Sequence, residues 1–315
     1  MDHRKTLDGQ AMGLMVLLCL IWGLQQVVLK AAATDISPLL QIALRSGIAA
    51  VLVGLLMRRQ GVRWAPDDGT LKPGLLAGFL FALEFLLVGE GLRFTSASHM
   101  VVFLYTAPIF VALGLHWKLP AERLAATQWL GVLLAFGGIA VAFLGRDGPA
   151  RTTGDMLWGD FLALLAGAAW GATTLAVRLS GLARAPATLT LQYQLVGAFV
   201  LLTPAAVALG QGGFAPTPLA WGSLLFHGLV VSFASYLAWF WLLRHYLASR
   251  LGVFSFLTPL FGVGFGVWLL DETLEPGFAA GAAMVLTGIA LVSGHGWLKA
   301  TLGARRRRAY AASDK

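Results

Sequence analysis

The chain has 315 residues, of which 58% are hydrophobic and 12% charged, with a mean hydropathy of +0.76 and a formal net charge of +8. Soluble domains are roughly a quarter charged, so this composition excludes a globular protein dissolved in water and indicates lipid as the solvent. The residues left outside the apolar stretches are too few for a soluble catalytic domain, because each membrane span uses about 20 residues.

The apolar stretches predict an all-α integral membrane protein with ten transmembrane helices. In chain order we expect spans at 11–29, 37–57, 72–92, 98–116, 123–144, 156–178, 188–209, 220–241, 250–270 and 274–295. The first stretch is long and lacks a cleavage site of the A-x-A type. It is therefore expected to be a membrane helix rather than a removable signal peptide.

The sequence carries an internal repeat with a period of about 150 residues. Trp22-Gly23 in the first span returns as Trp170-Gly171 in the sixth. Further matched pairs are Pro108 with Pro259, Gly131 with Gly281, and Gly138 with Gly288. Each unit holds an odd number of spans, so the second unit should begin on the opposite side of the membrane. We therefore expect two inverted five-helix repeats, as in alternating-access transporters.

The repeat also sets the expected division of the chain. The expected segments are a cytoplasmic N-terminus (1–10), a first repeat (11–144), an outer linker (145–155), a second repeat (156–295) and a basic cytoplasmic tail (296–315).

Basic residues predict the orientation in the membrane. Of the 23 Lys and Arg residues, 18 fall in the segments on the side of the two termini and 4 in those on the other side. The positive-inside rule then places both termini of this multi-pass protein in the cytoplasm. The run Arg305–Arg308 is expected to lie near anionic lipid rather than to bind nucleic acid.

Two charged side chains fall near the middle of predicted spans. Arg45 lies in the second span and Glu84 in the third. A charge at this depth is costly and marks a candidate functional residue. A purely structural role, in which the two side chains pair with each other or with carbonyl groups, is the alternative. We favour a binding site for a zwitterionic or anionic solute, with Glu84 also a candidate proton carrier.

A second group of candidate substrate-binding residues is uncharged at neutral pH. Amides, hydroxyls and aromatic rings recur inside several spans, and together they suit a small solute that has polar and apolar parts. The group consists of Trp22, Gln25, Gln26, Tyr105, Trp170, Thr174, Tyr193, Gln194, His227, Tyr236 and Trp239. A packed, hydrogen-bonded histidine is the competing interpretation of His227. Trp22 and Trp170 lie too deep in their spans for ordinary interfacial anchors.

Prolines occupy matched positions in the fourth and ninth spans. Pro108 and Pro259 each fall near the middle of a span, where a proline removes a helix hydrogen bond and kinks the chain. The match favours a role at a cavity boundary or gate. An inherited helix shape without a moving role is the alternative.

The sequence shows no motif for catalysis or for a cofactor. The histidines lack metal-ligand spacing, and neither a Walker loop nor a Ser-His-Asp order is visible. We therefore predict no enzyme, no metal and no cofactor. The single cysteine, Cys19, is expected to pack within the first span, and the acidic cluster Asp271, Glu272 and Glu275 to form a solvated turn.

Together these features resemble the EamA family of the drug/metabolite transporter (DMT) superfamily. The resemblance rests on the Trp-Gly pairs, the matched prolines, and Glu122–Leu124 and Glu272–Leu274 at the starts of spans five and ten, and covers about residues 11 to 296. It implies a central cavity lined by helices one to four and six to nine, without an ATP-binding domain. Members are mostly exporters of amino acids and other metabolites from the bacterial cytoplasm, driven by a proton gradient or by facilitated flow; others move sugars, nucleotide sugars or drugs. The resemblance therefore implies a bacterial inner (plasma) membrane.

The leading hypothesis is a secondary transporter that exports a small metabolite by alternating access, with an amino acid as the first candidate. One alternative is an importer of a sugar or similar polar solute. A membrane-embedded enzyme acting on lipid-linked substrates is another, although no converging acid, base or metal groups are apparent. A non-transporting membrane partner is the third. The expected partners are a small-molecule substrate, the lipid bilayer and, as a candidate coupling ion, the proton.

Overall fold

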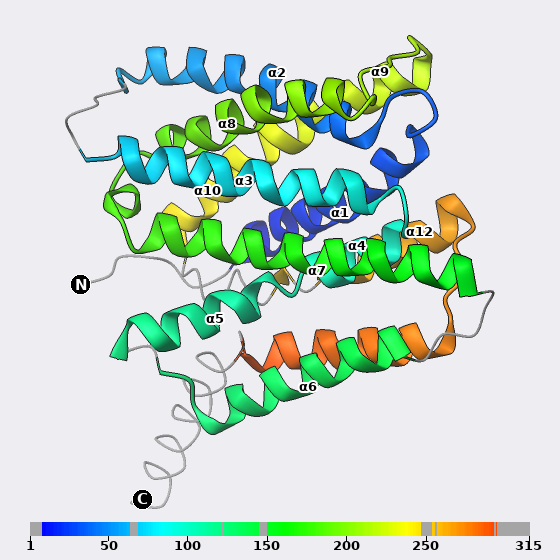
Figure 1. Ribbon diagram of the computed structural model, residues 1–315. Coiled ribbons are helices and arrows are strands. Elements are labelled where there is room, and N and C mark those ends of the chain that lie inside the picture. Colours follow the sequence, from blue (N-terminus) through cyan, green and yellow to red (C-terminus); the bar gives the residue numbers. More distant parts are fainter. Residues whose placement is uncertain are drawn as a thin grey trace, which may run out of the picture.

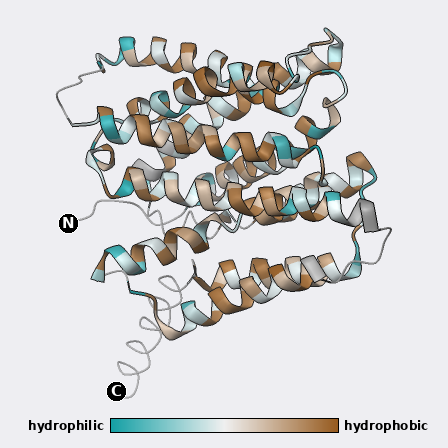
Figure 2. Ribbon diagram, in the orientation of Figure 1, coloured by the Kyte–Doolittle hydropathy of each residue, from teal (hydrophilic) through white to brown (hydrophobic). Residues whose placement is uncertain are grey.

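The computed structural model describes residues 8–63, 69–120, 123–144, 150–246, 254–255, 257–292 and 294. Within these ranges the regular elements are helices, and the backbone forms one isolated antiparallel bridge, between Ile36 and Phe214. The helices pack side by side in a single bundle (Figure 1). Figure 2 shows hydrophobic residues along the length of most helices. The all-α prediction is confirmed for the described part of the chain.

The first half of the chain contains α1 (Gly9–Ala31), α2 (Pro38–Arg59), α3 (Leu71–Gly91), α4 (Ala97–Leu104), α5 (Ala107–Lys118) and α6 (Ala126–Leu144). The second half contains α7 (Ala150–Arg178), the short 3-10 turn η3 (Gly181–Ala183), α8 (Ala187–Ala208), α9 (Pro218–Leu225), the π-helical segment η4 (Phe226–Ser235), α10 (Tyr236–His245), α12 (Leu257–Leu270) and a last helix, Pro276–Val292.

Seven helical stretches of the described chain are long and apolar enough to cross a membrane. They lie at the predicted spans one to four and six to eight. The predicted spans five, nine and ten correspond to the shorter apolar helices Ala126–Ala142, Leu257–Leu270 and Pro276–Val292. A multi-pass membrane protein is therefore supported, whereas the count of ten spans and the inverted repeat stay predictions.

The fourth predicted span is not one continuous helix. It consists of α4 and α5, with the break at Tyr105 and Thr106. Pro108 follows at the second position of α5, and because proline has no N–H it cannot donate to the carbonyl of Leu104 in an α-helical pattern. The break leaves α4 as a short segment in which all eight residues are buried.

Two further differences concern the second half. The eighth predicted span changes from α-helix to π-helix at Phe226 and back at Tyr236, a change for which the sequence carries no local signal. The segment 145–155, expected as a linker, is helical from Ala150 onward, where α7 begins.

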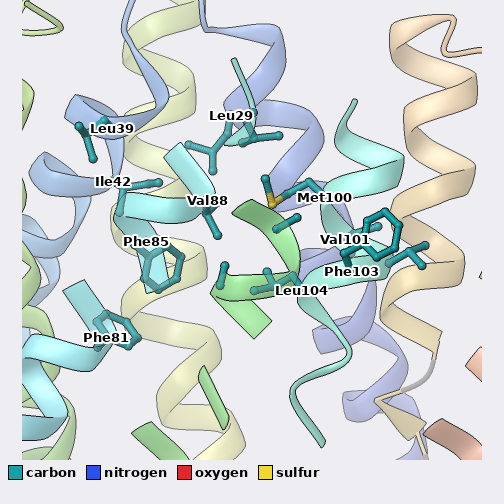
Figure 3. Packing of buried hydrophobic residues seen from close by; sticks show 14 of the residues in the cluster. Leu29, Leu39, Ile42, Phe81, Phe85, Val88, Met100, Val101, Phe103 and Leu104 are labelled. Carbon is teal, nitrogen blue, oxygen red and sulfur yellow. The ribbon is translucent and has the colours of Figure 1, made fainter. Parts of the chain in front are cut away.

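The main hydrophobic cluster draws residues from both halves of the chain, including the first four helices. Leu29 of α1, Ile42 of α2, Phe85 of α3 and Met100 of α4 meet in one cluster of buried side chains (Figure 3). Such packing brings the end of α1 close to the start of α2, and the candidate site lies beside this cluster, because Phe85 also contacts Arg45.

Glycines allow the closest helix contacts. A Cβ atom at Gly78 of α3 would come within 2.6 Å of the carbonyl oxygen of Tyr193 on α8. A Cβ at Gly131 of α6 would come within 2.7 Å of the Gly288 carbonyl oxygen, and one at Gly138 within 2.6 Å of that of Gly281. Helix α6 therefore packs backbone to backbone on the last helix, and the two lie at one edge of the bundle (Figure 1). Close approach of this kind is how helices gain contact where lipid supplies no hydrophobic drive.

Candidate functional site

Arg45 is a fully buried cation at the centre of the bundle. Its side chain is 1% exposed, and Nη1 donates to Oε1 of Gln25 at 3.1 Å. The guanidinium carbon lies 4.6 Å from the ring centroid of Phe85, a cation–π contact. Its Nε has no hydrogen-bond partner. An amide and an aromatic face thus hold the charge while one N–H donor remains available.

Glu84 brings the opposite charge into the same region from α3. It is 4% exposed and close enough to Arg45 for the two charges to attract. Its Oε2 has no hydrogen-bond partner. A buried polar atom left unpaired costs about 1–3 kcal/mol, and here a cation and an anion each keep such an atom.

Two amides and a histidine extend the polar region. Gln26 is 1% exposed and its Oε1 has no hydrogen-bond partner. The imidazole of His227 is fully buried, with Nδ1 2.7 Å from the carbonyl oxygen of Ser223 and Nε2 3.1 Å from that of Gln25. A neutral imidazole has a single N–H, so it donates to one of these carbonyls at a time. The packed-histidine interpretation fits these contacts, and His227 ties η4 to α1 beside Gln25.

Four of the predicted aromatic residues form two contacting pairs. Tyr105, at the break between α4 and α5, meets Trp170 of α7 edge to face with ring centroids 5.2 Å apart. Trp22 meets Trp239 in the same manner at 5.8 Å. Tyr105 and Tyr236 both lie within electrostatic range of Glu84.

The indole of Trp22 is also hydrogen-bonded. Its Nε1 donates to Oγ of Ser235 at 2.8 Å, so Trp22 is fixed against the end of the π-helical segment. Ser235 matches Glu84 in the internal repeat. The indole N–H of Trp22 thus finds its hydrogen-bond partner inside the helix bundle.

Three predicted site residues lie elsewhere or make contacts within their own helix. Tyr193 packs at the α3–α8 contact over Gly74, with its hydroxyl 3.4 Å from Oγ1 of Thr70. The hydroxyl of Thr174 donates to the carbonyl of Trp170, one turn earlier in α7. Gln194 is partly buried on α8.

The two prolines lie near helix starts. Pro108 directly follows the break before α5, and Pro259 is buried at the third position of α12. A gating role for either residue stays a prediction.

The structure adds polar residues that sequence reasoning had not assigned. Ser223 donates to the amide oxygen of Gln41, whose Nε2 has no hydrogen-bond partner. Asp160 is fully buried, accepts from Thr95 Oγ1, and pairs with Nδ1 of His99 at 2.9 Å. Asp160 could have been noticed as a charge near the start of a predicted span. Gln41 carried no signal beyond its polarity.

The expected solvated turn at 271–275 is wrong for Glu272. Its carboxylate accepts from the backbone N–H of Ala97 at 2.7 Å and from the N–H and hydroxyl of Ser98 at 2.9 and 2.5 Å. The first N–H groups of a helix have no acceptor within the helix and attract a carboxylate. Asp271 remains exposed and turns the chain with a φ of 52°.

A family model described as the EamA-like transporter family matches residues 10–144 and 157–294. "Uncharacterized transporter YoaV" of Bacillus subtilis (strain 168) is 27% identical over 271 residues, covering 86% of this chain and 92% of that protein. "Probable amino-acid metabolite efflux pump" of Escherichia coli (strain K12) is 28% identical over 301 residues, covering 91% and 96%.

One solved crystal structure is similar in fold. It aligns with a TM-score of 0.63 and 20% sequence identity, over 95% of this chain and 99% of that one. At this identity the likeness concerns the fold alone.

Proposed function

The chain belongs to the EamA-like transporter family, and on this premise we propose that it is a secondary transporter exporting a small zwitterionic metabolite. An amino acid is the first candidate substrate. Membership in a transporter family favours transport over the alternative of a membrane-embedded enzyme. The Escherichia coli relative, named as an amino-acid metabolite efflux pump, supports export as the direction.

The pairing of Arg45 with Glu84 carries the proposal. Arg45 keeps a free N–H and Glu84 a free carboxylate oxygen, both buried. A substrate carboxylate would accept from Arg45, and a substrate ammonium would donate to Glu84. Each contact would relieve a buried polar atom that is otherwise unpaired. A sugar would meet the two unpaired atoms only with neutral hydrogen bonds, whereas a zwitterion would bring an opposite charge to each, and charge-assisted hydrogen bonds are the stronger kind.

The surrounding side chains suit the rest of such a solute. Gln26 offers an unpaired amide oxygen, and Tyr105 and Trp170 present aromatic surface. Because Arg45 and Glu84 are buried, the site is closed to water in this conformation. Substrate exchange then requires the helices to move, as alternating access does.

The glycine contacts of α6 and the last helix support inverted repeats. In the sequence repeat Gly131 corresponds to Gly281, and Gly138 to Gly288. The structure pairs Gly131 with Gly288 and Gly138 with Gly281. Exchanging the two repeats turns one contact into the other, as a two-fold axis between the halves requires. We propose on this basis that residues 11–144 and 156–295 are the two inverted units, with both termini in the cytoplasm.

The experiment that tests the function begins with a thermal-shift screen of purified protein against amino acids, sugars and nucleosides. The best stabiliser is then loaded into proteoliposomes and its efflux measured. We expect a zwitterion to stabilise and to be moved, and the same solute without its ammonium or its carboxylate to do neither. Stabilisation and transport of a neutral sugar alone would overturn the proposal.

The direction of transport and its coupling to protons are measured in separate experiments. Vesicles of inverted and right-side-out orientation separate export from the alternative of import. A proton carried by Glu84 would make transport sensitive to an imposed pH gradient, and Glu84→Gln would remove that sensitivity.

A further inference from the structure

A groove on the side of the bundle has the marks of a second binding site. It has a volume of about 910 Å³ and runs between α2, α8 and α9, which lie together at one edge of the bundle (Figure 1). Leu44 and Val51 of α2, Phe199 of α8 and Trp221 of α9 are among its apolar lining residues. Val51 is 64% exposed and Trp221 49% exposed, so the groove opens outward from the bundle.

Two polar side chains lie toward one end of this groove. Gln192 lines it from α8, is 8% exposed, and its Oε1 has no hydrogen-bond partner. Its amide nitrogen lies 3.5 Å from the position that a Cβ at Gly54 would take. Arg58, also a lining residue and exposed, follows Gly54 by four residues and so lies about one turn further along the same face of α2. Gly54, beside which the amide of Gln192 lies, and Arg58 are therefore separated by about 6 Å of rise along α2. An unpaired acceptor and a free cation thus lie near the same end of the groove.

The apolar part of the groove has the length of one bilayer leaflet. From Leu44 to Gly54, α2 rises about 15 Å, which is half of the roughly 30 Å hydrocarbon core of a bilayer. Arg58, Arg59 and Arg63 lie at the polar end, where a headgroup region would begin. One end is therefore matched to a phosphate and the remainder to an acyl chain.

We propose that this groove binds one phospholipid whose headgroup carries a hydrogen-bond donor. The phosphate lies at the Arg58 guanidinium, and a headgroup ammonium or hydroxyl donates to Oε1 of Gln192. An acyl chain fills the groove beside Val51 and Phe199. Phosphatidylethanolamine and phosphatidylglycerol share this chemistry, whereas phosphatidylcholine has the phosphate but no donor. The site is separate from the Arg45–Glu84 pair and does not depend on the proposed substrate.

The two polar contacts can be tested separately. Purified protein in detergent is titrated with phosphatidylethanolamine, phosphatidylglycerol or phosphatidylcholine of identical acyl chains, and bound lipid is counted by native mass spectrometry. We expect one retained molecule of the first two lipids and weaker retention of phosphatidylcholine. Arg58→Gln should weaken the retention of all three lipids, by about fivefold for the anionic phosphatidylglycerol and by less for the two zwitterionic lipids. Gln192→Leu should abolish the preference over phosphatidylcholine without the loss common to all three.

Two further variants control for the loss of a positive charge and for filling of the groove. Arg59→Gln removes the same charge from the neighbouring residue, which does not line the groove, and should leave retention unchanged. Val51→Trp fills the apolar part and should displace the lipid while the thermal unfolding temperature stays close to that of the parent protein. Equal retention of the three lipids would overturn the proposal, as would equal effects of the two arginine variants or a lipid still bound to Val51→Trp. Displacement of the lipid by a transported solute or by a partner protein would also overturn it.

Discussion

The carboxylate of Glu272 accepts hydrogen bonds from both the backbone N–H and the hydroxyl of Ser98, at 2.9 and 2.5 Å. The two residues are 174 positions apart, so the contact joins the end of α12 to the beginning of α4. Lys30 of α1 donates to backbone carbonyls just before α4, including that of Thr95 at 2.9 Å. Its ammonium group is also attracted by the carboxylate of Glu272. One end of α1, α4 and α12 is thereby fastened together.

Replacing this carboxylate should loosen that end of the bundle. Glu272→Gln keeps one acceptor oxygen but loses the charge that satisfies the start of α4, so we expect stability to fall by about 1–2 kcal/mol. Denaturant or thermal unfolding in detergent measures the change. Asp271→Asn is the control, because Asp271 is exposed and Asn tolerates its positive φ. Equal effects of both substitutions would show that the hydrogen bonds of Glu272 contribute nothing.

Gly266 provides the space that Glu272 occupies. A Cβ at Gly266 would collide with Oε2 of Glu272 and Oγ of Ser98, so Gly266→Ala should destabilise the protein by about 1–3 kcal/mol. Gly264, two residues earlier on the same helix, has no atom within 4 Å of its Cβ position. Gly264→Ala should therefore be neutral, or stabilising by up to about 1 kcal/mol through helix propensity. The comparison requires only two unfolding curves, and the reverse order would contradict the packing described.

Substrate affinity should depend on both members of the charged pair. Arg45→Ala and Glu84→Gln each remove a charge-assisted contact, for which a loss of about 1.5–3 kcal/mol is expected, a tenfold or larger rise in the substrate Kd. Tyr193→Phe removes a hydroxyl at the α3–α8 contact and should leave the Kd unchanged. Binding is measured by calorimetry or thermal shift on variants that remain folded. If both charge variants bind as the parent protein does, the pair has no role in recognition.

The contact between α6 and the last helix should respond to either partner. Gly138→Val and Gly281→Val each place a side chain where the other backbone lies, and each should cost about 1–3 kcal/mol. Their effects should fall short of adding in the double variant, because both disrupt one contact. Gly137→Val, whose Cβ position meets only Met284 at 3.5 Å, is the matched control. Full additivity in the double-mutant cycle would argue against a shared contact.

Several residues of the site could be predicted from the sequence because charged side chains and deeply placed tryptophans are rare within apolar membrane spans. Arg45 and Glu84 stand out as charges in apolar stretches, and the structure buries both in one region. Trp22 and Trp170 were selected by their depth in the spans, and each makes an aromatic contact there. The resemblance to the EamA family, read from the Trp-Gly pairs and matched prolines, is confirmed by the family match.

Other features had no local signal. Glu272 occurs in a short acidic stretch that looks like any polar turn, and its partners lie 174 positions away. Tyr193 and Tyr105 are both tyrosines within apolar stretches, yet Tyr193 packs against α3 whereas Tyr105 contacts Trp170. The π-helical segment Phe226–Ser235 likewise has no local signal in the sequence.

The sequence by itself determined the solvent, the helical class, the approximate positions of the spans and the family, because hydropathy and repeat spacing are properties of the chain before it folds. Only the tertiary structure decided which polar atoms remain unpaired, which carboxylate closes the start of α4, and where a groove is left between α2 and α8. Those outcomes depend on distances between residues far apart in the chain, and such distances exist only once the helices have packed.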